Sequence, residues 1–227
     1  MQDQGRSHLT SSLVCLNWEE GMAKLELDSM DSVQYDVLKE IGNIGAGNAT
    51  TALATMLQVK VDMKVPKVAL LDFQELPEIL GGAENIIVGI LLTLSGNIDG
   101  MMMFVLERDA AHSMVNMLMG QDVPLDAEFS EMEASALQEI GNIITGAYLS
   151  SLSNLINMSI NASIPYIAVD MAGAILSVPA IEFGKLGDRA LMIEAEFGRD
   201  DADDINGYFL LIPTMESYNA IMTSLGL

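Results

Sequence analysis

The sequence has little of the side chains on which most enzyme active sites depend. It contains one cysteine and two histidines in 227 residues. A single cysteine, Cys15, excludes an internal disulfide framework and a thiolate metal cluster. His8 and His112 are the only imidazoles, and the apolar helical pattern around His112 is typical of a structural histidine. Ser-His-Asp, HExxH and CxxC arrangements are missing, so any chemistry must use carboxylates and amides, or groups that a substrate brings.

Basic residues are also scarce. Ten Lys and Arg side chains face 32 Asp and Glu side chains, which gives a formal charge of −22. Nucleic-acid binding needs basic patches, so this balance argues against a nucleic-acid partner. A protein partner must instead present a basic patch or bind through short-range contacts. The longest apolar run, residues 86–94, is too short to cross a bilayer as a helix. We therefore expect a cytoplasmic protein without membrane insertion.

What the sequence does contain is one stretch that occurs twice. Residues 36–47 read DVLKEIGNIGAG and residues 135–146 read SALQEIGNIITG, an offset of 99 positions. A proline also follows the asparagine of each copy by 23 residues: Pro66 after Asn43 and Pro165 after Asn142. Because the spacing holds over so long a stretch, we interpret the chain as two copies of one unit.

Each copy of this stretch predicts a helix with one polar and one apolar face. At about 100° per residue, four positions of each copy fall within roughly 60° of one another. They are Asp36, Glu40, Asn43 and Gly47 in the first copy, and Ser135, Glu139, Asn142 and Gly146 in the second. The apolar positions gather on the other side, as expected of a helix laid on a core: Leu38, Ile41, Ile44, Ala52 and Met56, then Leu137, Ile140, Ile144 and Ala147. Each unit thus presents an acid and an amide one turn apart.

Glycines are unusually frequent in these two helices. Each glycine in a helix interior costs roughly 1 kcal/mol relative to alanine. Five such positions are Gly42, Gly45, Gly47, Gly141 and Gly146. We expect something to approach the helices closely there.

An isolated Glu-x-x-Asn pair is usually an ordinary solvated helix face. A duplicated unit that had to keep only its packing would need only its apolar positions to match, yet Glu and Asn match as well. The match favours a functional face over an inert structural repeat. A dinucleotide or P-loop interpretation of residues 42–47 fails, because the glycine order is wrong and no Gly-Lys-Ser/Thr follows.

The pattern Asp/Ser-x-x-x-Glu-x-x-Asn, followed by 22 residues and Pro, resembles the signature of the CheC-type phosphatases of bacterial chemotaxis. This group includes CheC, CheX and the phosphatase part of FliY, and we place the chain nearest to CheC. Both copies fit the signature, and the resemblance covers the chain from about residue 30 to its end. It implies hydrolysis of the aspartyl phosphate on a CheY-type response regulator.

The resemblance also implies a role for each motif residue. Asn43 and Asn142 would orient the attacking water, and Glu40 and Glu139 would contact the lysine of the receiver's active site. Asp36 and Ser135 are weaker candidates for docking contacts, and Pro66 and Pro165 would shape the neighbouring strand. No cofactor of its own is expected, since the receiver would carry Mg²⁺. CheD is a further partner that the resemblance suggests.

An alternative from another class remains open. The chain could be a non-catalytic binding module that sequesters phosphorylated receiver or docks CheD. No residue pattern shows whether this chain binds CheD.

The rest of the sequence predicts an α/β (α+β) fold in which two α-β-β-β-α units are related by a pseudo-twofold axis. The sheet should be antiparallel or mixed, because the hairpin connections are too short for parallel crossovers. The two motif helices should lie side by side on the surface. We expect a single domain over residues 22–227, made of two repeats at about 31–120 and 130–227. Residues 1–21 stand outside the repeats: either translation starts at Met22, or they form a flexible tail.

The expected elements follow the same order in both units. In the first unit they are a helix over 31–57 with Asp31 or Ser32 as N-cap, β-rich residues 59–73, a short helix over 76–80, strands 86–94 and 100–106, and a helix over 108–119 capped by Gly120. In the second they are a helix over 130–155 with a capping box of Ser130 and Glu133, a strand-like run 158–171, a short helix over 172–176, strands 189–197 and 207–212, and a helix over 215–225. The acidic residues 198–206 predict a solvated hairpin turn rather than a calcium loop, because the Asp-x-Asp-x-Asp-Gly spacing is missing.

Overall fold

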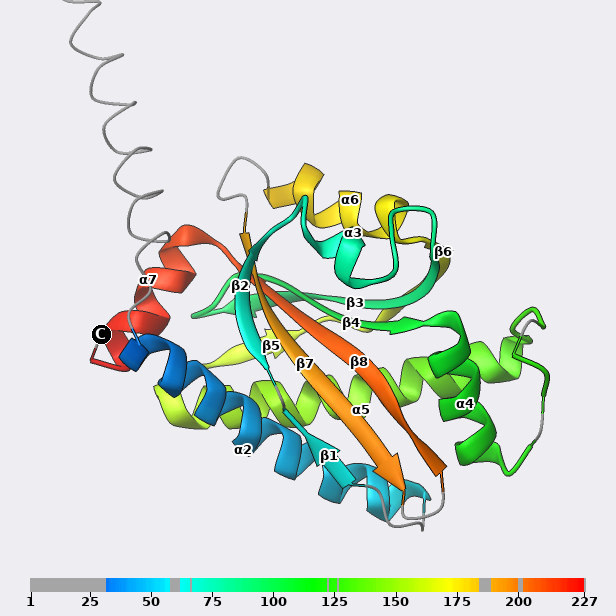
Figure 1. The fold of residues 1–227 in the computed structure, drawn as a ribbon. Helices are drawn as coiled ribbons and strands as arrows, with labels where there is room; N and C mark the ends of the chain where they lie inside the picture. Colours follow the sequence, from blue (N-terminus) through cyan, green and yellow to red (C-terminus); the bar gives the residue numbers. More distant parts are fainter. Residues whose placement is uncertain are drawn as a thin grey trace, which may run out of the picture.

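Two long helices and one eight-stranded sheet form the frame of the protein in the computed structural model (Figure 1). The structure describes residues 32–57, 62–65, 67–121, 123–125, 127–183, 189–199 and 202–226. The N-terminal extension, the candidate start Met22, the candidate cap Asp31 and Pro66 lie outside the described residues.

The elements occur in the same order in both halves of the chain. The first half contains α2 (Ser32–Leu57), β1 (Asp62–Lys64), β2 (Val68–Asp72), α3 (Leu76–Ile79), β3 (Ile86–Gly96), β4 (Gly100–Glu107) and α4 (Arg108–Met119). The second half contains α5 (Glu131–Ile156), β5 (Ile160–Ala162), β6 (Tyr166–Met171), α6 (Ala172–Phe183), β7 (Arg189–Arg199), β8 (Ala202–Pro213) and α7 (Met215–Ser224).

The predicted fold class is confirmed, and the units are more divided than predicted. The sheet is antiparallel throughout its pairings. Each unit has the order α-β-β-α-β-β-α rather than α-β-β-β-α. The difference arises because the β-rich run in each unit forms two short strands, and the helix that follows it, α3 or α6, separates them from the hairpin. Pro165 lies between β5 and β6, and proline cannot donate a hydrogen bond to a neighbouring strand.

The two units share one sheet, in which the first two strands of each unit pair with a strand of the other unit. The strand order is β1-β7-β8-β4-β3-β5, with β2 also paired to β7 and β6 also paired to β3. The first two strands of each unit therefore pair with the hairpin of the other unit. The order reads the same from either end once the units are interchanged, and the β4–β8 pair lies at its centre. This is the pseudo-twofold arrangement expected from the repeat.

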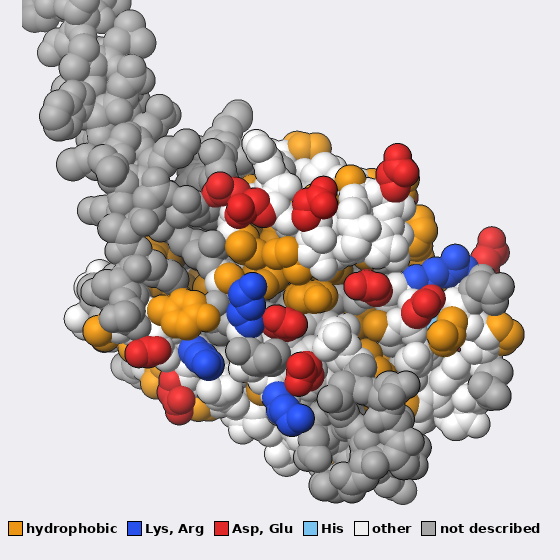
Figure 2. All heavy atoms as spheres, viewed as in Figure 1, with side chains coloured by type: hydrophobic (Ala, Val, Ile, Leu, Met, Phe, Trp, Pro, Cys, Tyr) orange, Lys and Arg blue, Asp and Glu red, His pale blue; other side chains and the backbone are white. Residues whose placement is uncertain are grey.

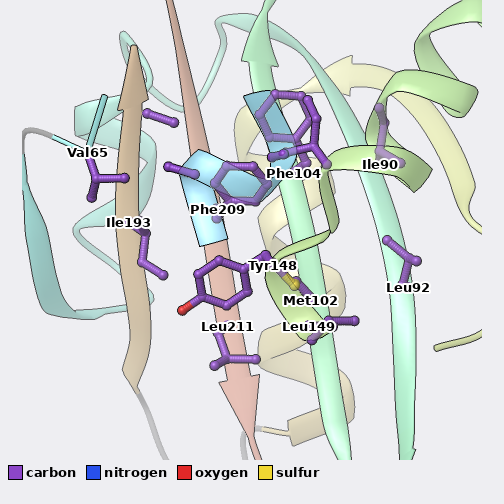
Figure 3. Close-up of a cluster of buried hydrophobic side chains, with 14 of the residues drawn as sticks. Val65, Ile90, Leu92, Met102, Phe104, Tyr148, Leu149, Ile193, Phe209 and Leu211 are labelled. Atoms are coloured by element: carbon purple, nitrogen blue, oxygen red, sulfur yellow. The ribbon is translucent and has the colours of Figure 1, made fainter. Parts of the chain in front are cut away.

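The core lies on both faces of the central strands. Side chains alternate along β4, so that Met102, Phe104 and Leu106 face the layer of α2, α5, α4 and α7. Their neighbours on β4 face α3 and α6 on the other side of the sheet (Figure 1). Phe104 stacks on Phe209 with ring centroids 4.7 Å apart, at the centre of the cluster in Figure 3. Burial on both faces explains why these strands read as continuous apolar runs.

Helix α2 lies with a narrow apolar stripe on the sheet. Leu38, Ile41, Ala49 and Leu53 are buried. The prediction for Ile44 is wrong, since 41% of its surface is exposed. Ile44 follows Glu40 by four residues, only about 40° around the helix, and therefore lies at the margin of the polar face.

The predicted ends of several helices are confirmed by their caps. Ser130 caps α5, and its hydroxyl accepts a hydrogen bond from the Glu133 amide while the Glu133 carboxylate accepts one from the Ser130 amide. Gly120 ends α4 with a left-handed φ of 61°, as predicted from glycine at that position. Helix α6 is longer than the predicted 172–176 and continues through Pro179 to Phe183.

The acidic segment between β7 and β8 is shorter than predicted. The strands extend into it, so that Arg199 pairs with Ala202 and all of residues 202–206 belong to β8. The structural role predicted for His112 is confirmed. It is fully buried, its Nε2 lies 3.0 Å from the Ala127 carbonyl oxygen, and its ring stacks on Phe129.

Candidate functional site

The polar face of α2 presents the first copy of the motif to solvent. The side chains of Asp36, Glu40 and Asn43 are exposed, and Gly47 is exposed one turn further along the same face. None of these side chains makes a hydrogen bond or ion pair with another described residue. The carboxylate and the amide are therefore available for contacts with another molecule.

The polar face of α5 presents the second copy in the same way. Ser135, Glu139, Asn142 and Gly146 are all exposed, while Leu137, Ile140 and Ile144 are buried beneath them. The capping box at Ser130 sets where this helix begins, and the burial of its apolar stripe turns the polar face outward.

The two motif helices lie against each other and run in roughly opposite directions in Figure 1. The Asn48 amide donates a hydrogen bond of 2.8 Å to the Ser151 hydroxyl across the contact. Gly45 lies so close to Tyr148 that a Cβ there would meet the ring at 2.5 Å and the Tyr148 Cα at 3.3 Å. Tyr148 is buried in the core, and this burial raises the pKa of its phenol above the ordinary value. The contact places both faces on one layer of the protein.

Gln138 connects the second motif to its proline. Its side-chain amide donates a hydrogen bond of 2.6 Å to the carbonyl oxygen of Pro165, which is buried. Gln138 precedes Asn142 by one turn on the flank of the polar face. The long spacing between asparagine and proline thus corresponds to a direct link between the helix and the β5–β6 connection. Sequence reasoning missed this link because it spans 27 residues.

The surroundings of the two faces differ. Val65, in the β1–β2 connection, is 7% exposed and packs against Gly42, where a Cβ would lie 3.3 Å from its side chain. Ile164, at the same position of the second unit, is 86% exposed, and Tyr166 nearby is 68% exposed. Exposed apolar side chains therefore flank the second motif at Ile164 and Tyr166, whereas the equivalent position of the first unit, Val65, is buried.

Both signs of charge occur on the side of the molecule seen in Figure 2, where acidic side chains are spread over the surface and a few lysine and arginine side chains lie among them. Among the described residues, no three His, Cys, Asp or Glu side chains are grouped so that they could hold a metal ion. No helix in the described part of the chain is long and apolar enough to cross a membrane.

Each face offers a carboxylate and a carboxamide one helical turn apart, on a rigid element. A carboxamide can donate and accept hydrogen bonds at once, so it can hold a water molecule in a fixed direction. The described part of either face brings no thiol and no imidazole to the motif. Such a face can position a water molecule and bind a cation, and it suits a substrate that brings the remaining groups.

Comparison with known proteins supports one family. The model of the CheC-like family matches residues 33–70, which contain the first motif, and the model of the chemotaxis phosphatase CheX matches residues 87–181, which contain the second. The CheY-P phosphatase CheC of Bacillus subtilis is 33% identical over 197 residues, covering 85% of this chain and 94% of that protein.

Solved structures share the fold at lower identity. Thermotoga maritima FliY superposes with a TM-score of 0.69 at 21% identity, covering 86% of this chain and 98% of that one. The FliM middle domain from H. pylori superposes with a TM-score of 0.62 at 13% identity, covering 86% and 99% of the two chains.

Proposed function

The chain belongs to the CheC-like family, and we propose that it dephosphorylates a CheY-type response regulator. The observation that carries this proposal is the pair of equivalent exposed faces, in which Glu40 and Asn43 on α2 match Glu139 and Asn142 on α5. The name of the Bacillus subtilis relative, a CheY-P phosphatase, supports the same substrate.

The residues present are sufficient for this reaction. An aspartyl phosphate is already activated toward hydrolysis, and the receiver supplies Mg²⁺ and a lysine that stabilise the phosphoryl group. What remains is a water molecule held in line with the phosphorus, and positioning is most of what phosphoryl transfer asks of a protein. Asn43 or Asn142 holds that water. The water oxygen bonds to phosphorus, the bond from phosphorus to the aspartyl oxygen breaks, and free carboxylate and inorganic phosphate result.

Glu40 and Glu139 anchor the helix on the receiver. Each lies about one turn before the asparagine and is exposed on the same strip. A carboxylate there pairs with the receiver's active-site lysine and directs the asparagine into the phosphorylated pocket. Asp36 and Ser135 lie one turn further from the asparagine and make outer docking contacts. Their different chemistry makes the two faces unequal in affinity.

The test is the decay of a phosphorylated CheY-type receiver with and without the protein. We expect faster decay with the wild type, partial loss in Asn43→Ala or Asn142→Ala, and at least a tenfold loss in the double variant, since removing a positioned catalytic group typically costs 10²-fold or more (on the order of 3 kcal/mol). Receiver binding should be largely retained in the double variant, because the glutamates remain.

Asn154→Ala is the matched control for this experiment. Asn154 is also an exposed asparagine of α5, outside the motif face. It should leave the decay rate unchanged. A double variant as active as the wild type would refute the roles assigned to the asparagines.

The second candidate function is a binding module that sequesters phosphorylated receiver or docks CheD without catalysis. The similarity to the FliM middle domain, at 13% identity, shows the fold alone, and a fold by itself does not establish an active site. Measurable binding of phosphorylated receiver without any change in its decay would select this function over the phosphatase.

A further inference from the structure

We propose that Gly47 and Gly146 are the points where a bound receiver comes closest to the two motif helices, so that the lack of a side chain there is a requirement for docking. This inference rests on the proposed function, because it assigns a partner to the same two faces.

The other glycines of these helices are explained by contacts within the protein. A Cβ at Gly45 would meet the Tyr148 ring at 2.5 Å, and a Cβ at Gly141 would meet Ile90 at 2.6 Å. A Cβ at Gly42 would meet Val65 at 3.3 Å. These three glycines allow α2 and α5 to lie close to each other and to the sheet. Their presence needs no partner.

Gly47 and Gly146 have no such explanation. Both are exposed, and a Cβ at either would meet nothing within 4 Å among the described residues. Neither residue has the left-handed φ that would favour glycine. Alanine would be the more stabilising residue at an exposed helix interior. The free protein therefore gains nothing from glycine at either position.

Their position points to the partner. Gly47 follows Asn43 by four residues, and Gly146 follows Asn142 by four, so each glycine lies one turn beyond the amide on the same face. Side chains on a helix tilt toward its N-terminus. A side chain at Gly47 would lean over the turn that carries Asn43, which is the turn that must enter the phosphorylated pocket. The two copies share this feature although their neighbours differ, since Ala46 and Asn48 correspond to Thr145 and Ala147.

A different role for the glycines would be local flexibility of the helix. The two roles predict opposite answers to the question of which substitution, alanine or glutamine, impairs the protein more. Alanine has the higher helix propensity and the smaller side chain. If the glycines are needed for flexibility, alanine should impair the protein more than glutamine. If they are needed for space, glutamine should impair it more.

The experiment compares three double variants: Gly47→Ala with Gly146→Ala, Gly47→Gln with Gly146→Gln, and the control Thr55→Gln with Asn154→Gln. The control residues are exposed, lie eight positions beyond the glycines on the same helices, and are equivalent in the two units. The readouts are the melting temperature, the affinity for a CheY-type receiver loaded with beryllofluoride and Mg²⁺, and the decay rate of the phosphorylated receiver.

We expect the alanine variant to melt about 2–4 °C higher for each site. It should nevertheless bind the receiver a few times more weakly than the wild type, while the glutamine variant binds on the order of tenfold more weakly or worse. The control should bind as the wild type does. Gly45→Ala should lower the melting temperature, because its Cβ would collide with Tyr148.

The outcomes separate this inference from the proposed function. Wild-type activity together with unchanged affinity in the glutamine variant would overturn the inference and leave the phosphatase in place. A larger loss with alanine than with glutamine would also overturn it, in favour of flexibility. If the wild type neither binds the receiver nor speeds its decay, both the inference and the proposed function are wrong.

Discussion

At the scale of single residues, the two exposed glutamates carry the charge that the proposed docking needs. Glu40 and Glu139 are solvent-exposed, and neither side chain makes a hydrogen bond or ion pair with another residue in the described part of the chain. Replacing them should therefore change binding without unfolding the protein, because surface substitutions away from packed sites usually alter stability within about 0.5 kcal/mol.

We predict that Glu40→Lys with Glu139→Lys weakens receiver binding at least about tenfold. Each new lysine would face the receiver's active-site lysine, so that a repulsion between two positive charges replaces an ion pair. Titration of the receiver at two salt concentrations measures this, and the difference should shrink at high salt. The control is Glu78→Lys with Glu84→Lys, two exposed acids on the α3 side of the sheet. Both pairs change the formal charge from −22 to −18, so only position differs. If the two double variants bind the receiver with equal affinity, the motif glutamates do not have the anchoring role.

At the scale of elements, a capping box stabilises the start of α5, the helix that carries the second motif. The hydroxyl and the amide of Ser130 both donate hydrogen bonds to the Glu133 carboxylate, at 2.6 Å and 2.8 Å. These bonds lower the pKa of Glu133, with the side-chain hydrogen bond as the largest cause. The helix N-terminus is thus stabilised by the ionised form of one carboxylate.

Ser130→Ala should destabilise the protein by about 1 kcal/mol at pH 7 because it removes this cap. Because the pKa of Glu133 is lower in the folded state, its contribution is present above the unfolded pKa, about 4.3, and is lost as pH falls through the folded value. The destabilisation by Ser130→Ala should therefore be smaller near pH 3. Urea unfolding of the wild type and of Ser130→Ala, at pH 7 and near pH 3, measures this difference in the free energy of unfolding.

Glu131→Gln is the control, since Glu131 is an exposed acid in the same first turn outside the capping box. It should not reproduce the pH dependence of the Ser130→Ala effect. An equal cost of Ser130→Ala at both pH values would contradict the charged capping box.

At the scale of the whole molecule, the exchange of strands makes the two repeats depend on each other. Strands β1 and β2 of the first unit pair with β7 of the second, and β5 and β6 of the second pair with β3 of the first. Helix α2 also packs on the other unit, where a Cβ at Gly42 would lie 3.6 Å from Ile193. Each unit alone would leave its hairpin with an unpaired edge and an uncovered apolar face.

We predict that residues 22–127 and 128–227, expressed separately, do not fold, and that the intact chain unfolds in one cooperative transition. Circular dichroism and thermal unfolding of each half, of their mixture and of the intact protein measure this. The mixture should recover helical signal that neither half shows alone. A half that melts cooperatively within a few degrees of the intact chain would show that the repeats are independent domains.

The sequence by itself determined the features that depend on nearby residues. Helical periodicity placed Glu40, Asn43, Glu139 and Asn142 on exposed faces, and short-range caps located the ends of α4 and α5, because these interactions span four residues or fewer. The repeat itself predicted the pseudo-twofold symmetry. Ile44 was misplaced because it lies at a boundary between faces, where periodicity alone does not decide burial.

Only the tertiary structure decided which partners meet across the chain. The strand exchange, the hydrogen bond from Asn48 to Ser151 and the bond from Gln138 to Pro165 join residues 27 or more positions apart, for which one sequence carries no local signal. The same contacts divided the helix glycines into Gly42, Gly45 and Gly141, which the fold needs, and Gly47 and Gly146, which it does not. The reason is physical: a missing side chain has a function only in relation to the atoms that take its place, and those atoms come from distant segments or from another molecule.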